Sequence, residues 1–270
     1  MDKITPTIDF ASELADLNDV KGKVAYLPGG YGGLGEAIAW GLTLRGACVV
    51  VSGRSKEKAQ GLASQLTAHG MGAMGISMDV KSVPEIKDSV DAVVEKFGAV
   101  DILVNCVGIQ REELLLDVTE EAYDDVYQSN LRSAMFLAQA TARHQVAAGK
   151  KGKQVHLLSV RAKLGLRHRG YSAYCSTKGG LVMLIKQHAM ELAPHGITVN
   201  GVAPTFVYTE MIRHVMENPE FKKQLFDRIP LGRIADPKDV VGPVLFFCSP
   251  ASDFVTGQTI YVDGGITASQ

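Results

Sequence analysis

Short runs of apolar and β-branched residues alternate with longer amphipathic stretches from Lys23 onward. The apolar runs cover residues 23–27, 48–52, 73–77, 101–105, 154–159, 197–203 and 259–263. Between them, apolar residues recur at helical spacing over residues 33–45, 55–69, 82–97, 120–148, 172–193 and 236–248. Strands that are apolar on both faces are typical of a parallel sheet covered by helices on both sides. The pattern therefore predicts an α/β fold, a Rossmann-type doubly wound parallel sheet of about seven strands, whose ligands bind beyond the carboxyl ends of the strands.

The same pattern predicts one domain. No internal repeat, low-complexity tract or Pro/Gly/Ser linker divides the chain, so we expect a single dinucleotide-binding unit over residues 21–270. Residues 1–20 lean acidic without strong periodicity, and we expect an arm that is flexible or contacts another subunit. Residues 204–228 mix charged and apolar positions after the sixth predicted strand. We expect a lid there that offers Met211, Ile212 and Val215 to the substrate.

The composition of the chain limits the classes of partner that it is expected to bind. The 270 residues are 46% hydrophobic and carry 28 basic and 29 acidic side chains, so no summed charge draws the protein to nucleic acid or to an anionic membrane. No apolar run reaches the roughly 18 residues of a membrane span, and the first residues do not resemble a signal peptide. The four cysteines lack C-x-x-C spacing, and the histidines lack H-E-x-x-H spacing, so we expect no metal site. We interpret Cys106 and Cys175 as small buried hydrophobes and expect a cytoplasmic protein with small-molecule partners.

A glycine-rich turn, "PGGYGGLG" at 28–35, joins the first predicted strand to a helix. Glycines allow the backbone to approach a pyrophosphate, and a helix N-terminus offers free N–H groups and partial positive charge. Two dinucleotide-binding spacings fit, one through Gly30, Gly32 and Gly35 and the other through Gly29, Gly33 and Gly35. The candidate cofactor-binding residues in this turn are Gly29, Gly33, Leu34 and Gly35.

The end of the second predicted strand bears on the choice of cofactor. A dinucleotide without a 2′-phosphate is usually held by Asp or Glu about 20 residues after the turn, but Gly53 stands at that distance from Gly33. Ser52, Arg54 and Ser55 offer donors instead, and a guanidinium suits bidentate contact with a phosphate. We therefore expect NADP, with NAD as the alternative if Arg54 is only a solvated turn residue.

Several further motifs, taken with this turn, resemble the short-chain dehydrogenase/reductase family from Lys23 to Gly265. "DV" at 79–80 is similar to its adenine-binding pair, "NCVG" at 105–108 to its N-A-G-type strand end, and "APTFVYTEM" at 203–211 to its P-G-x-[IV]-x-T segment. Its four catalytic positions match Asn130, Ser159, Tyr174 and Lys178. The resemblance implies cofactor contacts by Asp79, Val80, Asn105, Gly108, Tyr174, Lys178, Pro204, Val207 and Thr209. It also implies a homotetramer or homodimer with helices 120–148 and 172–193 at an interface.

The stretch "YSAYCSTKGG" at 171–180 contains the proposed reactive group. Tyr174 and Lys178 are four residues apart and so share a helix face, whereas Tyr171 finds only Cys175 at that spacing and is expected to be a pocket wall or a core aromatic. A phenol with a pKa of about 10 is too weakly ionised at pH 7 to serve both reaction directions. We expect Lys178, together with an oxidised nicotinamide, to lower the pKa of Tyr174.

The resemblance assigns a role to each catalytic position. It implies that Tyr174 is the general acid and base and that Ser159 donates to the developing alkoxide. It further implies that Lys178 binds the nicotinamide ribose and that Asn130 holds a water in a proton relay.

Two departures from the family pattern stand out. Pro28 replaces the usual Thr and has no N–H, so the link from the turn to the strand end near Asn105 is weakened or replaced. The 15 positions from Ser159 to Tyr174 exceed the family spacing by about two, so the intervening loop must bulge. That loop is basic, which fits either attraction of an anionic substrate or a solvated or subunit-contacting surface, the second slightly favoured. Its cations are Arg161, Lys163, Arg167, His168 and Arg169.

These features predict an NADP(H)-dependent oxidoreductase of carbohydrate metabolism that interconverts a secondary alcohol and a ketone. A polyol, keto sugar or sugar acid is the expected substrate, because "RIPLGRIADPKDVVG" and "SDFVTGQTIYVDGG" look most like the polyol and gluconate-type branch. One alternative is a 3-oxoacyl-thioester reductase, which would use the same catalytic residues. Another is a non-catalytic sensor or scaffold that binds the dinucleotide without turnover.

Overall fold

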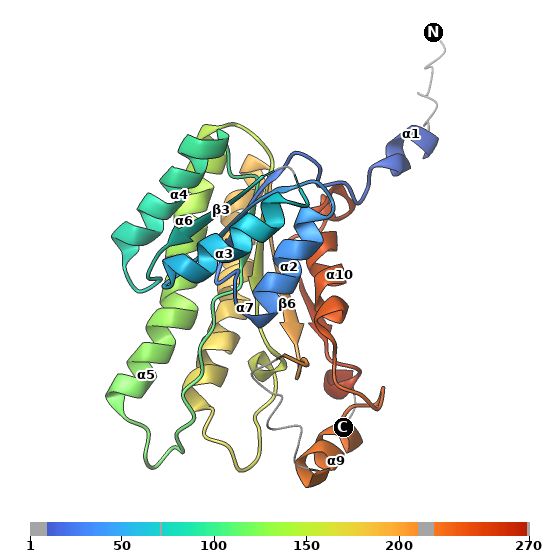
Figure 1. Cartoon of the computed structure of the whole chain (residues 1–270). Helices are drawn as coiled ribbons and strands as arrows, with labels where there is room; N and C mark the ends of the chain where they lie inside the picture. Colours follow the sequence, from blue (N-terminus) through green and yellow to red (C-terminus); the bar gives the residue numbers. More distant parts are fainter. Residues whose placement is uncertain (1–9, 71, 210–218, 269–270) are drawn as a thin grey trace.

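A seven-stranded parallel sheet forms the centre of the protein. The computed structural model describes residues 10–70, 72–209 and 219–268 (Figure 1). The strand order is β3-β2-β1-β4-β5-β6-β7, and every neighbouring pair is parallel. The strands are β1 (Val24–Pro28), β2 (Cys48–Gly53), β3 (Ala73–Ser77), β4 (Ile102–Asn105), β5 (Gly152–Leu157), β6 (Ile197–Pro204) and β7 (Thr259–Val262). The predicted doubly wound fold is confirmed, and the order reverses between β1 and β4, where such sheets bind ligands.

Helices cover both faces of the sheet. α2 (Gly33–Thr43), α3 (Lys56–Thr67) and α10 (Pro237–Cys248) pack on one face through a cluster that includes Ile38, Leu62 and Phe247. α4 (Val83–Phe97), α6 (Ser133–Ala147) and α7 (Ser172–Leu192) cover the other face, with α4 and α6 at the left of Figure 1. The strands are apolar on both faces because both faces are buried.

The predicted helix over residues 120–148 is interrupted. α5 (Glu120–Tyr127) passes into a π-helical turn, η1 (Gln128–Arg132), before α6 begins. One residue is thereby added to the turn that contains Asn130. Wide turns of this kind occur often at functional sites.

The remaining elements lie at the ends of the chain and in connections. α1 (Phe10–Ala15) precedes a short segment in which Leu17 O accepts a hydrogen bond from Ala251 N at 2.7 Å and Val20 is buried. The short helices η2 (Val160–Ala162) and η3 (Ala193–His195) flank α7, while α9 (Pro219–Asp227), η5 (Pro250–Ser252) and η6 (Ile266–Ala268) belong to the C-terminal part. None of the described helices is long and apolar enough to cross a membrane.

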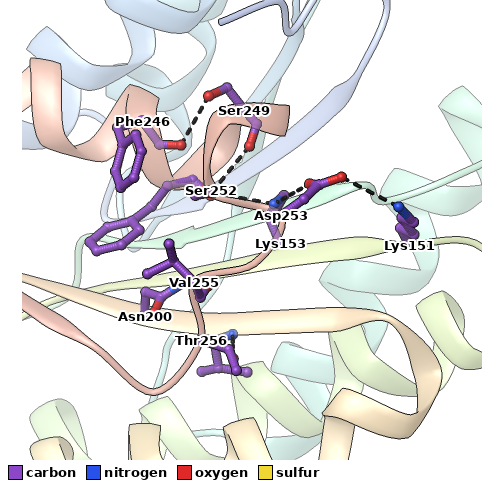
Figure 2. A network of polar contacts seen from close by, with 11 residues as sticks. Lys151, Lys153, Asn200, Phe246, Ser249, Ser252, Asp253, Val255 and Thr256 are labelled. Carbon is purple, nitrogen blue, oxygen red and sulfur yellow. Dashed lines mark hydrogen bonds and ion pairs between the residues drawn. The ribbon is translucent and has the colours of Figure 1, made fainter. Parts of the chain in front are cut away.

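A polar network ties the amino end of β5 to the turn after α10 (Figure 2). Lys153 Nζ lies 2.7 Å from Asp253 Oδ1 and 3.3 Å from Ser252 Oγ, and Lys151 Nζ approaches the same carboxylate at 3.4 Å. The Asn200 side chain joins β6 to this turn by donating to Val255 O at 2.8 Å. The network lies at the opposite end of the strands from the ligand-binding edge.

Candidate active site

The glycine turn after β1 leaves a narrow space that only glycine backbone fits. Gly29 has φ +75°, and a Cβ there would lie 3.0 Å from the carbonyl carbon of Cys106. A Cβ on Gly35 would lie 2.5 Å from Gly29 O. The turn therefore packs against both β4 and its own helix, which explains why these two positions need glycine.

The N-terminus of α2 fits a phosphate. Gly32 precedes the helix and no described side chain caps it, so the first N–H groups of the helix, including that of Leu34, keep their capacity to bind an anion. Pro28 O accepts a hydrogen bond from Cys106 N at 2.9 Å. This backbone bond joins the turn to the end of β4, so the link that Pro28 was expected to disturb is made by backbone atoms. The cradle formed by Gly29, Gly33 and Gly35 fits a dinucleotide pyrophosphate.

At the end of β2, one residue expected to bind the phosphate is unable to do so, and one unexpected residue lies beside the strand end. Ser52 is fully buried and its hydroxyl donates to Tyr26 Oη at 2.9 Å, so it cannot donate to a phosphate at the surface. Arg54 is exposed, and its guanidinium makes no hydrogen bond or ion pair with a described residue. Tyr31 was not expected here: its ring covers Gly53, where a Cβ would lie 2.6 Å away, and its hydroxyl accepts from Ser55 N at 3.0 Å. The sequence feature that could have indicated this contact is the presence of an aromatic residue, Tyr31, inside the glycine motif.

The residues that are expected to contact the adenine and the nicotinamide lie at or just after the ends of β3 and β4. Asp79 Oδ1 accepts from Lys81 N at 3.0 Å, and Val80 packs on the core cluster beside α4. Asn105 is buried, with Oδ1 accepting from Val107 N at 3.0 Å and Nδ2 3.3 Å from His156 Nδ1. Burial lowers the pKa of His156 to about 3, helped by the charges of His188 and Lys178. His156 is thus a neutral core residue.

Tyr174 and Ser159 meet at the carboxyl edge of β5. Ser159 follows the strand and begins η2, while Tyr174 lies in the first turn of α7. Burial raises the pKa of Tyr174, opposed by its hydrogen bond with Ser159 and by the charge of Arg161. Tyr171 packs edge-on against Tyr174 with ring centroids 6.1 Å apart, as a wall beside the phenol.

Lys178 lies one turn further along α7 and is buried. Its Nζ donates to Leu157 O at 2.8 Å and lies 5.6 Å from the centre of the Tyr174 ring, while a Cβ on Gly108 would be 3.4 Å from it. Burial lowers the pKa of Lys178 to about 8. The expected lowering of the Tyr174 pKa by Lys178 is not found: desolvation of the phenol outweighs the groups that lower its pKa, and those are Ser159 and Arg161.

Asn130 is held by the π-helical turn so that its amide faces the segment after β4. Oδ1 accepts from Ile109 N at 2.8 Å, and Nδ2 donates to Ile109 O at 2.9 Å and to Thr177 Oγ1 at 3.3 Å. Asn130 therefore fixes the backbone next to Gly108 and touches α7 one residue before Lys178. The structure brings Asn130, Ser159, Tyr174 and Lys178 to one edge of the sheet, beside the glycine turn.

The basic loop between Ser159 and Tyr174 divides into different environments. Arg161 is buried, Arg169 pairs with Glu112, and Lys163 Nζ lies 4.1 Å from the centre of the Tyr261 ring. Arg167 and His168 are exposed, and His168 has φ +59°. Most of these cations therefore have different neighbours and do not form one exposed basic surface.

The segment after β6 reaches the glycine turn. Thr205 N donates to Val262 O at 3.1 Å next to Pro204, and Val207 pairs with Ala235 in a parallel bridge. A Cβ on Gly33 would lie 3.3 Å from Thr209 Cγ2, so Thr209 borders the phosphate turn. Met211, Ile212 and Val215, expected in the lid, lie outside the described residues.

Comparison with known proteins identifies the family. The family model described as enoyl-(acyl carrier protein) reductase matches residues 30–267. Gluconate 5-dehydrogenase of Gluconobacter oxydans is 37% identical over 94% of this chain and 98% of that protein. A 3-oxoacyl-[acyl-carrier-protein] reductase of Staphylococcus aureus is 36% identical over 90% of this chain and 98% of its own.

A solved structure agrees with the sequence relatives. The crystal structure of a gluconate 5-dehydrogenase from Burkholderia cenocepacia in complex with NADP and tartrate superposes with a TM-score of 0.90. It is 35% identical and covers 95% of this chain and 100% of that one. The chain belongs to the short-chain dehydrogenase/reductase family and is an oxidoreductase of its gluconate-type branch.

Proposed function

We propose that the protein is an NADP(H)-dependent oxidoreductase that interconverts a secondary alcohol and a ketone on a sugar acid. The observation that carries this proposal is the arrangement of three side chains after the carboxyl end of β5. The Ser159 hydroxyl is near enough to lower the pKa of Tyr174, and Lys178 is buried one turn further along α7. A phenol, a hydroxyl and an ammonium in this arrangement can hold a carbonyl oxygen and exchange one proton with it.

Tyr174 would supply the proton. Its raised pKa keeps the phenol protonated at neutral pH, which suits donation to a carbonyl oxygen during reduction. Ser159 would donate a hydrogen bond to the same oxygen as negative charge develops on it. In the oxidative direction the phenolate must accept the proton, and the nearby charge of Arg161 favours that form.

Lys178 and Asn130 would position the cofactor and the backbone around the site. With a pKa of about 8, Lys178 is mostly protonated at neutral pH and can donate both to Leu157 O and to a ribose hydroxyl. Asn130 positions the backbone at Ile109, and through Thr177 it contacts the helix that carries Tyr174 and Lys178. We propose that it also carries the proton relay toward solvent.

The cofactor would lie along the edge formed by the ends of β1, β2 and β4. The glycine cradle and the uncapped start of α2 would hold the pyrophosphate, and Arg54 would bind the 2′-phosphate. Asp79, Val80, Asn105 and Thr209 border the same edge. When bound, NADP(H) supplies the hydride-transfer chemistry.

The relatives support a sugar acid as the substrate. Besides the two gluconate 5-dehydrogenases, 5-keto-D-gluconate 5-reductase of Escherichia coli is 34% identical over 93% of this chain. A hydroxy or keto acid of this class would place its reacting carbon at Tyr174 and Ser159. We propose that residues 204–228 cover it.

The test is a panel of ketones and alcohols read by nicotinamide absorbance with both cofactors. We expect reduction of 5-keto-D-gluconate with NADPH, and a loss of at least about 100-fold in kcat for Tyr174→Phe, because general acid–base catalysis contributes about that much. Near-normal turnover by the phenylalanine variant would refute the role of Tyr174. Cofactor binding without turnover of any compound would favour the sensor alternative.

A second candidate is reduction of a 3-oxoacyl thioester. It is favoured by the reductase from Staphylococcus aureus and by three exposed leucines, Leu114, Leu115 and Leu116, next to the loop that packs on Gly170. Such an apolar surface would suit an acyl chain. Turnover of acetoacetyl thioesters in the same panel, without turnover of keto sugar acids, would select this function.

We also propose that copies of the chain associate through α6 and α7. A groove between these helices is lined by Met135, Ala138, Ala142, Val146, His188 and Leu192. Met135 and Val146 remain 36% and 37% exposed. Small alanine side chains would let a second pair of helices approach closely, which is how helices form large apolar contacts.

A further inference from the structure

Arg161 lies two residues after Ser159, and its backbone N–H is hydrogen-bonded to the Ser159 side chain. Its N–H donates to Ser159 Oγ at 3.2 Å, and its guanidinium Nη1 donates to Gly165 O at 2.7 Å and Leu164 O at 3.3 Å. Leu164 O is also approached by the thiol of Cys175, at 4.0 Å, and Cys175 follows Tyr174 in α7. The side chain is therefore folded back over the loop toward the residues that surround the phenol.

The charge of Arg161 is buried and has no counter-ion among the described residues. Only 6% of the residue is exposed, and no carboxylate among the described residues lies within 4.0 Å of it. The chain does supply carboxylates to other arginines, such as Arg111 with Asp125 and Arg233 with Asp239. A buried charge without a partner is costly, so natural proteins rarely keep one unless a ligand compensates it.

The guanidinium also has donors to spare. Nη1 makes both bonds to the loop, whereas Nε and Nη2 make no hydrogen bond to any residue that the structure describes. The fork of N–H groups on arginine matches the two oxygens of a carboxylate. A ligand with a carboxylate would satisfy the charge and the free donors together.

The surroundings favour an anion at this place. Burial lowers the pKa of Arg161, and the charge of Arg228 lowers it further, so two cations face one region. Leu164 packs against the cluster of Leu225, Ile229, Ile234 and Ile266, so this loop lies beside α9 and the C-terminal part, where the substrate is expected. The reacting oxygen of a substrate would then lie at Tyr174 and its carboxylate at Arg161.

We propose that Arg161 binds the carboxylate of the substrate and so selects sugar acids over neutral sugars. This inference rests on the proposed function, since it assumes that the substrate is reduced at Tyr174. It assigns the task to one buried guanidinium and not to the exposed cations of the same loop.

The experiment measures binding and turnover separately. Binding uses the holoenzyme with tartrate, a hydroxy dicarboxylate, and with threitol, the neutral polyol of the same carbon skeleton, titrated by calorimetry. Turnover uses 5-keto-D-gluconate and the neutral ketose fructose. We compare wild type with Arg161→Gln, which keeps an amide donor for the loop carbonyls, with Arg161→Lys, which keeps the charge, and with Arg167→Gln, which removes an exposed charge.

We expect Arg161→Gln to weaken tartrate binding and to raise KM for 5-keto-D-gluconate by about 10- to 100-fold, the range of a charged hydrogen bond. Arg161→Lys should fall between it and wild type. Threitol, fructose and all arms with Arg167→Gln should change by less than about threefold. Circular dichroism and thermal unfolding of each variant establish that it is folded.

The outcomes separate the two claims. If wild type reduces neither sugar, the proposed function fails, whatever the tartrate titrations give. If wild type reduces the acid but Arg161→Gln lowers activity equally on acid and neutral sugar, Arg161 only supports the loop and the inference is wrong. An equal loss in Arg167→Gln would assign the preference to the general charge of the loop and would also overturn it.

Discussion

At the scale of single residues, we expect Arg54 to decide between NADPH and NADH. It lies just past β2, next to the glycine turn, and its exposed guanidinium makes no hydrogen bond or ion pair with a described residue. We expect Arg54→Ala to lower kcat/KM with NADPH by about 10- to 100-fold and to leave NADH little changed, because only NADPH carries the 2′-phosphate. Lys58→Ala, which removes a nearby exposed cation from α3, is the matched control. Steady-state kinetics with both cofactors test this, and equal losses with NADPH and NADH would remove the phosphate role.

The buried ammonium of Lys178 should make the stability of the protein depend on pH. Its pKa falls from 10.5 in the unfolded chain to about 8 in the folded one. Between these values the unfolded chain binds more protons, so this group makes the folded state more stable as pH rises. We expect the free energy of unfolding of wild type, relative to Lys178→Met, to increase by about 2 kcal/mol from pH 7.5 to 9.5. Urea unfolding at several pH values measures it, and a constant difference would contradict the burial of the charge.

The residues also mark the limit of prediction from sequence. The pairing of Tyr174 with Lys178 could be predicted because their spacing along a helix is local, and Lys178 Nζ lies 5.6 Å from the centre of the Tyr174 ring. The glycine turn could be predicted from local spacing for the same reason, and it joins β1 to α2. The burial of Ser52 could not be predicted in this way. The side on which a strand residue points depends on the pleat of the strand and on contacts with neighbouring strands, here with Tyr26. Tyr31 and the single charge of Arg161 likewise depend on contacts between distant segments.

At the scale of elements, the first turn of the βαβ unit combines cofactor binding with packing. Gly29→Ala would place a Cβ 3.0 Å from the Cys106 carbonyl carbon at φ +75°, where a side chain is also strained. We expect a loss of about 1–3 kcal/mol in stability and weaker NADPH binding. Gly61→Ala is the control, because a Cβ at that exposed helical position meets nothing within 4 Å and should stabilise by about 0.5–1 kcal/mol. Unchanged cofactor affinity in Gly29→Ala would show that the turn does not touch the phosphates.

The break between α5 and α6 shows why an element can be located but not fully described from sequence. The apolar spacing over 120–148 is continuous enough to predict one helix, and α5 and α6 do occupy that range. The π-helical turn is formed because Asn130 satisfies both backbone groups of Ile109, which is 21 residues away in the chain. Helical periodicity contains no information about such a contact.

At the scale of the whole molecule, association through α6 and α7 would set the size of the particle in solution. We expect wild type to be a dimer or tetramer by light scattering after size exclusion. Replacing Met135 and Val146 together by Glu should lower the mass, because two charges would be buried in an apolar groove. Leu44→Glu changes an exposed residue at the end of α2 and should leave the mass as it is. A monomeric wild type would refute the proposal.

The two ends of the sheet have separate tasks, one chemical and one structural, and the Lys153 network allows this to be tested. Lys153 has an 11% exposed side chain and relies on Asp253 for its counter-charge, whereas Lys151 is 78% exposed and binds the same carboxylate at longer range. Asp253→Asn leaves a nearly buried ammonium without a carboxylate, and we expect a cost of about 1–2 kcal/mol, below that of a fully buried pair because the carboxylate is partly solvated. Lys151→Gln should cost about 0.5 kcal/mol or less.

Urea unfolding measures the loss of stability in both variants, and kcat tests whether the network affects the chemistry at the other end of the sheet. Because the network lies at the amino end of β5 and Ser159 follows the carboxyl end, kcat of both variants should remain within about twofold of wild type at temperatures where they are folded. A large loss of kcat in Asp253→Asn with little loss of stability would mean that the strand transmits the state of its amino end to the site. Equal costs for the two variants would mean instead that burial of Lys153 does not decide the strength of the pair.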